Sequence, residues 1–394
     1  MLGPDERKPA IRISLGEMKR ARPHDCGAIA AALQPYVDRG EMAGAVLLVA
    51  DRDRVLNATA VGWADLARKR PMTADALFWI ASITKPITSA ALMMLVDEGR
   101  VRVRDPVEKY LPEFADLRVV AKRTWARTVL VRPRRKPTLQ HLLTHTSGMP
   151  MTSPLEKPTL DLLPLEVAAR SHAMHPLLFH PGRRYAYSNA GINTVGRVME
   201  VVSGLAYDEF LSRRLFRPLG MRDTTFVPSA LQIARLARPH GPNAAKTRLV
   251  GKPIPYLKSP LDDPSRQPVP GGGLFSTARD LARFAQMILR GGTWKGRRYL
   301  SRQAVRRMTR RHTPRTFEKG YGWGWTVEPH AFGHSGAFGS KMFLHPKHGL
   351  ITIFLVQQEG WLGAGEEAHE TFRETAIRAY GSRRTRGSSS LLSS

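Results

Sequence analysis

The feature that most constrains this chain is a serine and a lysine at the start of an amphipathic helix. Ser82 and Lys85 stand three residues apart in the run Trp79-Ile80-Ala81-Ser82-Ile83-Thr84-Lys85. Residues at that spacing are neighbours on a helix, so the lysine amine can reach the serine hydroxyl. A serine hydroxyl needs an adjacent proton acceptor to become a nucleophile, and a partly desolvated lysine can serve. The pair predicts a nucleophilic serine, although so short a match also arises by chance.

The pattern of apolar residues predicts where this helix begins and ends. Proline is tolerated only in the first turn, so Pro86 places the helix start close to Ser82. Gly99 suits the C-terminal end. One face carries the apolar residues Ile83, Ile87, Ala90, Ala91, Met94 and Leu95. The N-terminal amides of such a helix stabilise negative charge that develops on a substrate.

Strand patterns occupy both ends of the chain and helix patterns occupy its middle. Predicted strands are 43–50, 55–63, 322–327, 341–345 and 350–357. Predicted helices are 105–114, 138–148, 165–175, 190–203, 207–216, 277–289 and 366–380. Residues 119–136 read as a basic hairpin, and 239–270 as a long surface loop. We therefore predict an α+β fold: one antiparallel sheet formed by both chain ends, flanked by helices, with an inserted helical lobe and a cleft between.

The same pattern predicts the domain boundaries. Residues 1–22 read as a flexible N-terminal extension, and the serine-rich tail 381–394 as disordered. One catalytic domain is expected over 23–380. Its sheet lobe would take 23–115 and 270–380, and its helical lobe 116–269.

Three further segments contain motifs that accompany the serine and the lysine. They are 180–191, which contains Tyr187-Ser188-Asn189, then 271–281, which begins Gly271-Gly272-Gly273, and 332–339, which contains His334-Ser335-Gly336. With these motifs in this order, the chain resembles the class C β-lactamase-like serine hydrolases. That superfamily includes β-lactamases, D-Ala-D-Ala carboxypeptidases, D-aminopeptidases and β-lactamase-like carboxylesterases. The resemblance runs from about Gln34 to Tyr380 and includes the stretches 141–148 and 218–221.

The resemblance implies a role for each motif residue. Ser82 would be the nucleophile, Lys85 its proton partner and Tyr187 a second general acid or base. The implied substrate-binding residues are Asn189, His334, Ser335, Gly336 and Ala337, with the amides of Ser82 and Ala337 forming the oxyanion hole. No metal ion or organic cofactor is required.

The protonation state of Tyr187 is a separate expectation. A tyrosine with an ordinary pKa of about 10 acts as a phenolate at neutral pH only beside a cation. We expect Lys85 to supply that positive charge, so that the two groups titrate as a unit.

His334 departs from the lysine that β-lactamases of this superfamily usually carry. Histidine is mostly neutral at pH 7 and gives a substrate carboxylate no fixed partner. The expected activity is therefore a serine hydrolase that works through an acyl-enzyme on a small ester or amide. Carboxylesterase ranks first, D-amino-acid peptidase second and β-lactamase third.

Each of these residues also has a plainer interpretation. Ser82 can cap a helix beside a solvated Lys85, Tyr187 can be a packed core residue, and His334 can be structural. His141 and His145, four residues apart, can bind a metal, but no third ligand is evident and capping or packing is favoured. Two rivals come from other classes: a catalytically silent relative that serves as a binding module, and a polyanion-binding protein with a silent hydrolase fold.

The net charge of +28 raises the question of polyanionic partners. The charge is accompanied by no zinc-finger spacing, aromatic-basic RNA motif or basic heptad run. We therefore expect no specific nucleic-acid partner and only a weak attraction to polyanions. The N-terminus has no signal-peptide pattern and Cys26 stands alone, so cytoplasmic residence is expected, with export as the alternative if the start codon is misassigned. The sequence does not indicate an oligomeric state.

Overall fold

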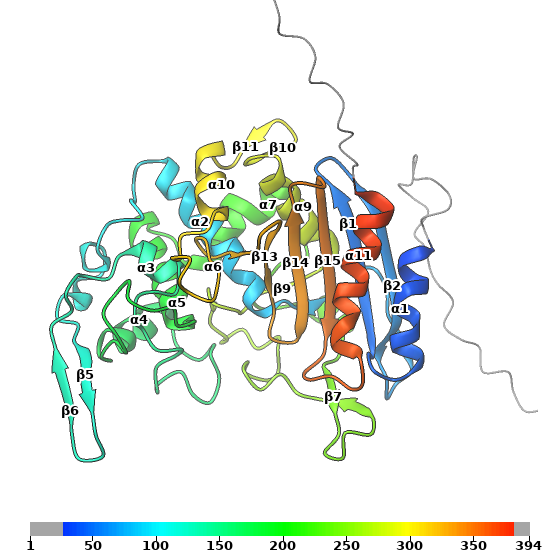
Figure 1. Ribbon diagram of the computed structural model, residues 1–394, viewed down its shortest axis with the longest axis horizontal. Coiled ribbons are helices and arrows are strands. Elements are labelled where there is room, and N and C mark those ends of the chain that lie inside the picture. The colour runs from blue at the N-terminus through cyan, green and yellow to red at the C-terminus, as the bar shows by residue number, and fades with distance from the viewer. Residues whose placement is uncertain (1–26, 382–394) are drawn as a thin grey trace, which may run out of the picture.

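A seven-stranded antiparallel sheet lies at the centre of the computed structural model, which describes residues 27–381 (Figure 1). The predicted extension 1–22 and the tail beyond 381 lie outside the described residues. The strand order is β12-β13-β14-β15-β1-β2-β3. The strands are β1 (Gly44–Asp51), β2 (Val55–Asp65), β3 (Arg70–Pro71), β12 (Thr326–Val327), β13 (Phe332–Ser335), β14 (Gly339–His345) and β15 (Leu350–Gln357). The prediction that both chain ends form one antiparallel sheet is confirmed.

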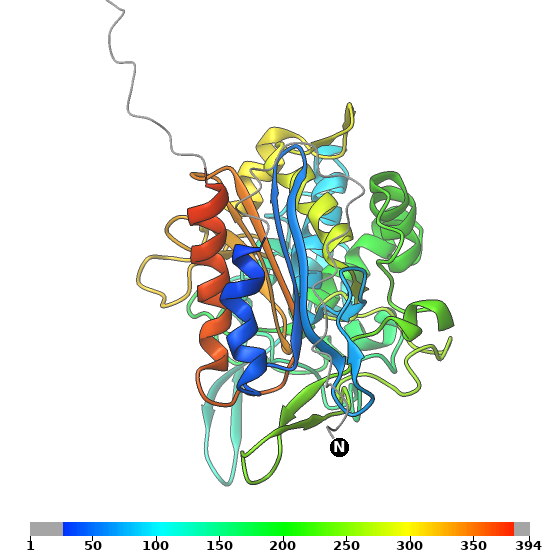
Figure 2. The same cartoon turned by 90° about the vertical axis from the view of Figure 1, so that its right-hand side faces the viewer.

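The two central strands are apolar along almost their whole length because helices cover both faces of the sheet. β1 pairs with β15, with Leu48 opposite Ile353. Helices α1 (Ala28–Asp38) and α11 (Ala368–Tyr380) lie side by side on one face (Figure 2). Helices α2 (Thr84–Asp97) and α9 (Ala278–Leu289) cover the other. Successive side chains of these strands therefore pack alternately against the two helix layers.

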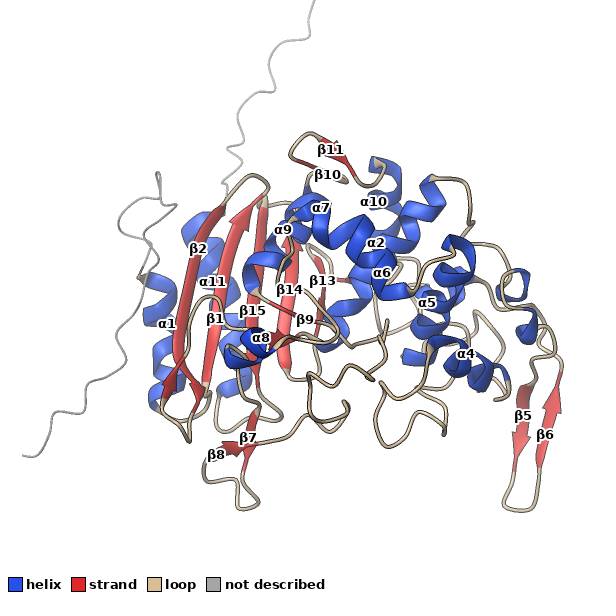
Figure 3. Cartoon of the chain, turned by 180° about the vertical axis from the view of Figure 1, so that it is seen from behind, coloured by secondary structure: helices blue, strands red, loops and turns tan. Residues whose placement is uncertain are grey.

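Most of the other helices lie to one side of the sheet, as Figure 3 shows from behind. The remaining helices of the described residues are α3 (Leu139–Leu143), α4 (Leu165–Ala173), α5 (Asn189–Ser203), α6 (Tyr207–Leu211), α7 (Arg217–Leu219), α8 (Ala230–Ala234) and α10 (Arg302–Thr309). A π-helical turn, Ser212–Phe216, joins α6 to α7. The division into lobes at residues 116 and 269 stays a prediction.

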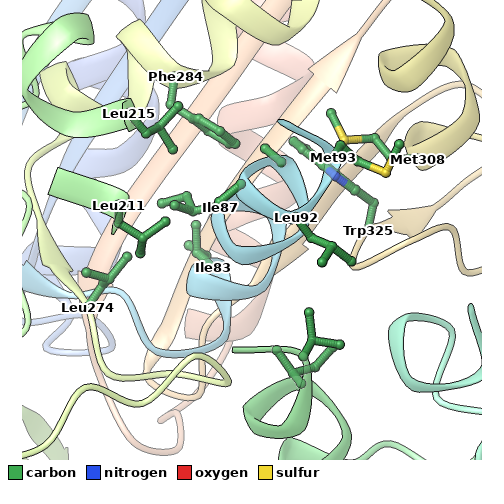
Figure 4. Packing of buried hydrophobic residues seen from close by; sticks show 14 of the residues in the cluster. Ile83, Ile87, Leu92, Met93, Leu211, Leu215, Leu274, Phe284, Met308 and Trp325 are labelled. Carbon is green, nitrogen blue, oxygen red and sulfur yellow. The ribbon is translucent and has the colours of Figure 1, made fainter. Parts of the chain in front are cut away.

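Helix α2 is the centre of the core rather than a one-sided amphipathic helix. Every residue from Thr84 to Leu95 is buried. Figure 4 shows Ile83 and Ile87 facing Leu211, Leu215 and Leu274, while Met93 faces Met308 and Trp325. Burial on all sides fixes the start of α2, and with it the position of the serine before it.

Several local predictions need correction. Helix α1 was not predicted, since its sequence is apolar on more than one face and contains Pro35. The predicted helix 105–114 is two 3₁₀ turns, Val107–Lys109 and Pro112–Phe114. Only the last two residues of the predicted strand 322–327 are extended, because Trp323 and Trp325 turn into the core instead.

Short two-stranded sheets complete the chain. A hairpin of β5 (Val119–Arg123) and β6 (Thr128–Val131) confirms the predicted basic hairpin. The others are β4 (Phe78–Trp79) with β9 (Phe275–Ser276), β7 (His240–Pro242) with β8 (Leu249–Gly251), and β10 (Thr293–Trp294) with β11 (Arg297–Arg298). Residues 239–270 are therefore not wholly a surface loop. Within residues 27–381, every helix is too short or too polar to cross a bilayer.

Candidate active site

Ser82 lies in a 3₁₀ turn, Ala81–Ile83, that leads directly into α2. Ala81 has a φ of +44°, a left-handed conformation that costs free energy for a residue with a Cβ. Neighbouring hydrogen bonds hold the turn: the Ile80 amide donates to the Leu274 carbonyl at 2.9 Å and the Trp79 indole to the Gly272 carbonyl at 2.7 Å. Ser82 itself stays partly exposed between buried neighbours. A rigid turn thus presents an accessible hydroxyl.

Lys85 is completely buried and makes three polar contacts through Nζ. It lies 3.0 Å from Ser82 Oγ, 2.8 Å from Asn189 Oδ1 and 2.5 Å from the carbonyl oxygen of Gly271. The predicted approach of the lysine to the serine is therefore present. Asn189 serves as a partner of the lysine, a contact the sequence did not predict.

Burial lowers the pKa of Lys85 well below its ordinary value. The contacts are consistent with a neutral amine, because Asn189 Oδ1 and the Gly271 carbonyl are both acceptors and each takes one N–H. In the neutral form these two bonds use both N–H groups, which leaves the lone pair available to Ser82 Oγ, 3.0 Å from Nζ. This arrangement can accept the serine proton.

Tyr187 precedes α5, whose first turn is capped by the Ser188 side chain accepting from the Gly191 amide. Lys85 Nζ lies 4.5 Å from the centroid of the Tyr187 ring. Burial raises the pKa of Tyr187, while a hydrogen bond with Ser82 acts in the opposite direction. Because burial outweighs the other influences and raises the pKa of Tyr187, the expectation of a tyrosinate is not supported. Tyr187 is a protonated phenol beside the serine and can donate that proton.

His334 is buried and both ring nitrogens have partners inside the protein. Its Nδ1 donates to the Ser335 carbonyl at 2.8 Å, and its Nε2 lies 2.8 Å from the hydroxyl of Tyr321. Burial lowers the pKa of His334 to about 3, so the ring is neutral. A direct contact between His334 and the substrate was predicted, but neither ring nitrogen is free to make one.

Tyr321 joins His334 to His145 in one chain of hydrogen bonds, which the sequence did not predict. The Ser188 amide donates to His145 Nδ1 at 3.1 Å, so His145 Nε2 carries the proton and donates to the Tyr321 oxygen at 3.1 Å. Tyr321 in turn donates to His334 Nε2. With both imidazoles neutral, every proton in the chain has one possible position. The chain links the backbone next to Tyr187 to the end of β13.

The end of β13 lies against the turn that carries the nucleophile. A Cβ placed on Gly336 would be 2.7 Å from the carbonyl oxygen of Ile80, so only glycine allows this approach. Ser335 and Ala337 on either side are exposed. The amide N–H groups of Ser82 and Ala337 make no hydrogen bond to other described residues. Both donors are free for an oxyanion, as the resemblance implies.

A second buried hydrogen-bond network holds Gly271, whose carbonyl oxygen contacts Lys85. Asn193 Oδ1 accepts from the Gly271 amide at 2.9 Å and its Nδ2 donates to Glu156 Oε1 at 3.1 Å. Glu156 Oε2 lies 2.9 Å from His172 Nε2. Although burial raises the pKa of Glu156, its bonds to His172 and other donors outweigh this and keep it ionised. A signal for Asn193 existed in the sequence, because it stands one helical turn after Asn189.

His141 and His145 have separate structural roles. His141 completes a capping box with Thr138 at the start of α3, as the capping interpretation predicted. The ring of His145 packs 4.4 Å from that of Tyr187, centroid to centroid. Among residues 27–381, no group of three or more potential metal-ligating side chains comes together.

This fold and this arrangement of serine, lysine and tyrosine define a class of serine hydrolases. The Beta-lactamase family model matches residues 29–376, so the chain belongs to the β-lactamase family and is a serine hydrolase of that fold. It is 31% identical to Protein Rv1367c of Mycobacterium tuberculosis (strain ATCC 25618 / H37Rv) over 364 residues, covering 83% of this chain and 88% of the relative. It is 30% identical to the esterase EstB of Burkholderia gladioli, covering 67% and 71%.

Solved structures share the fold. EstCE1, described as a hydrolase with promiscuous acyltransferase activity, superposes with a TM-score of 0.75 at 24% identity, covering 89% of this chain and 97% of that one. At that identity the likeness concerns the fold alone.

Proposed function

We propose that the protein is a carboxylesterase that cleaves small neutral esters through an acyl-enzyme on Ser82. The observation that carries the proposal is the buried amine of Lys85, whose Nζ lies 3.0 Å from Ser82 Oγ and whose pKa is lowered by burial. A base of this kind activates a serine without an ionised partner. The likeness to the esterase EstB favours an ester among the substrates of the family.

In the acylation step, Ser82 Oγ attacks the ester carbonyl carbon while its proton passes to Lys85 Nζ. The amides of Ser82 and Ala337 stabilise the oxyanion that forms. Tyr187 donates its hydroxyl proton to the departing alkoxide oxygen as the carbon–oxygen bond breaks, and the ammonium of Lys85 returns a proton to Tyr187. The alcohol leaves and the acyl group stays on Ser82.

Deacylation runs through the same groups in reverse. A water molecule takes the place of the alcohol and attacks the acyl carbon, while its proton passes to Tyr187 as the Tyr187 hydroxyl proton passes to Lys85 Nζ. Ser82 recovers its proton as the acid leaves. Asn189 contributes by holding Lys85 and orienting its lone pair.

The proposed substrate preference follows from the neutral state of His334. His334 is uncharged and fully bonded, so it attracts no substrate carboxylate. A neutral acyl group therefore needs nothing from this position, whereas the carboxylate of a β-lactam or of a C-terminal D-amino-acid peptide finds no charged partner at His334. A D-amino-acid peptidase remains the second candidate, since an amide carbonyl fits the same oxyanion hole.

A side-by-side assay tests this function. We expect p-nitrophenyl butyrate to give a higher kcat/KM than a D-alanyl-D-alanine peptide or a chromogenic cephalosporin. Faster turnover of the peptide or the cephalosporin would overturn the esterase assignment and leave the serine mechanism in place. Cytoplasmic residence stays a prediction, which fractionation of producing cells tests.

A further inference from the structure

The β5–β6 hairpin projects away from the body of the protein (Figures 1 and 3). Every residue from 121 to 132 is exposed. A hairpin with both faces in solvent adds nothing to the core, so its sequence is free to serve a contact outside the molecule.

Its composition is basic and apolar together. Residues 119–136 contain seven Lys or Arg and no Asp or Glu. Trp125 is 100% exposed, and Leu130, at 45%, is one of three exposed aliphatic side chains on β6. A solvated charged surface explains the arginines but not a tryptophan fully in water, whose indole favours an interface between water and an apolar medium.

The hairpin is also firmly held. At its base, Val119 is buried and the Val120 amide donates to the Leu177 carbonyl at 2.9 Å. At its tip, the Thr124 amide donates to the Arg127 carbonyl at 2.9 Å, and the Arg127 amide donates back to Thr124 Oγ1 at 3.1 Å. This turn places Trp125 at the extreme end of the projection.

A second basic hairpin points in the same direction. The turn between β7 and β8 projects from the same side of the molecule as β5–β6 in Figures 1 and 2. Lys246 and Arg248 lie exposed in it, and no Asp or Glu occurs between residues 224 and 261. Two basic tips on one side can meet a single flat surface.

We propose that the β5–β6 hairpin, with the β7–β8 turn, docks this protein on an anionic lipid surface. The lysines and arginines neutralise lipid phosphates and carboxylates, and the field extends about one Debye length from the membrane. Trp125 enters the headgroup region, and the aliphatic side chains of β6 follow it. A nucleic acid would satisfy the charges but not the aliphatic side chains, so the lipid surface fits the hairpin better.

The test is co-flotation of the full chain with vesicles of phosphatidylcholine alone or with phosphatidylserine added. We expect binding to the anionic vesicles only, and weaker binding as salt is raised. The combined substitution Lys122→Gln, Arg123→Gln, Arg127→Gln should lower the partition coefficient by about a hundredfold, because each charge near the surface contributes about a fivefold factor. Trp125→Ser should lower it at unchanged charge, and should remove quenching of tryptophan fluorescence by brominated lipid.

A matched control removes the same charge elsewhere. Lys295→Gln, Arg297→Gln, Arg298→Gln alters the β10–β11 hairpin, which projects from the opposite end (Figure 1). This control should bind like the wild type, and all variants should hydrolyse a water-soluble ester equally. Equal loss in the control, equal binding to both vesicle types, or binding of RNA but not vesicles through the hairpin would overturn the proposal.

Discussion

At the scale of single residues, burial decides which groups around Ser82 carry protons. It lowers the pKa of Lys85 and of His334 and raises that of Tyr187. Burial therefore shifts the lysine towards its neutral, basic form and the tyrosine towards its protonated, acidic form. This assignment differs from a tyrosinate stabilised by lysine, and the two make different predictions about pH.

The first prediction concerns that pH dependence. Protonation of Lys85 removes the lone pair that accepts the serine proton, so kcat/KM should fall as pH drops through the lowered pKa of Lys85. Because the pKa of Tyr187 is raised, the rate should stay level into the alkaline range rather than fall near pH 10. A rate that instead rises in step with ionisation of a tyrosine would point to the phenolate.

The second prediction separates positioning from proton transfer. Tyr187→Phe should lower kcat by about 10²–10⁴, as expected for loss of a general acid. Tyr321→Phe removes only the link between His145 and His334, and should lower kcat by about tenfold to a hundredfold with little change in KM and no change in the pH profile. Tyr299→Phe, at a half-buried tyrosine away from these groups, is the control. A shifted pH profile in Tyr321→Phe would give it a direct part in proton transfer.

At the scale of elements, sequence patterns predicted those parts whose periodicity is simple. The strands β1 and β15 and the helices α5 and α9 were predicted within a few residues. Helix α1 was missed because alanines surround its apolar residues and Pro35 interrupts its sequence. The sequence motifs predicted that Ser82, Lys85 and Tyr187 lie together. Tyr321 and Glu156 were not predicted, because they lie in loops and no spacing in the sequence relates them to the serine. Their partners are set by tertiary structure alone.

The third prediction tests the contact between β13 and the nucleophile turn. Gly336→Ala should push the strand end away from the Ile80 carbonyl and lower kcat, because it displaces the Ala337 amide from the oxyanion hole. The loss of one such donor costs about 10²–10³ in rate. Gly27→Ala, where an added Cβ meets no atom within 4 Å, is the matched substitution. Normal turnover in Gly336→Ala would remove Ala337 from the proposed oxyanion hole.

At the scale of the whole molecule, the segment 239–270 is tied to the helical side by one buried ion pair. Arg266 Nε donates to Asp161 Oδ2 at 2.6 Å, with the two side chains 2% and 0% exposed. Arg266 also donates to the Phe226 carbonyl at 3.0 Å. The arginine thus joins three loops. Its ion pair with Asp161 helps to order a segment whose sequence reads as a surface loop.

The fourth prediction follows from that pair. Asp161→Ala leaves a buried guanidinium unpaired and should lower the free energy of unfolding by about 3–5 kcal/mol, measured by urea denaturation. Glu166→Ala breaks the ion pairs of a half-exposed carboxylate with Arg170 and Arg197 and should change the free energy of unfolding by about 0–1 kcal/mol. Equal small effects would mean that the buried pair does not hold the loops together.

The central claim, that Ser82 carries the acyl group, is tested most directly by mass spectrometry of the trapped enzyme. After reaction with a fluorophosphonate, the wild-type protein should gain the mass of one adduct, located by peptide mapping on Ser82. Ser82→Ala should gain none, although its fold and its thermal stability should match the wild type. An adduct on another residue, or one that survives in Ser82→Ala, would contradict the account.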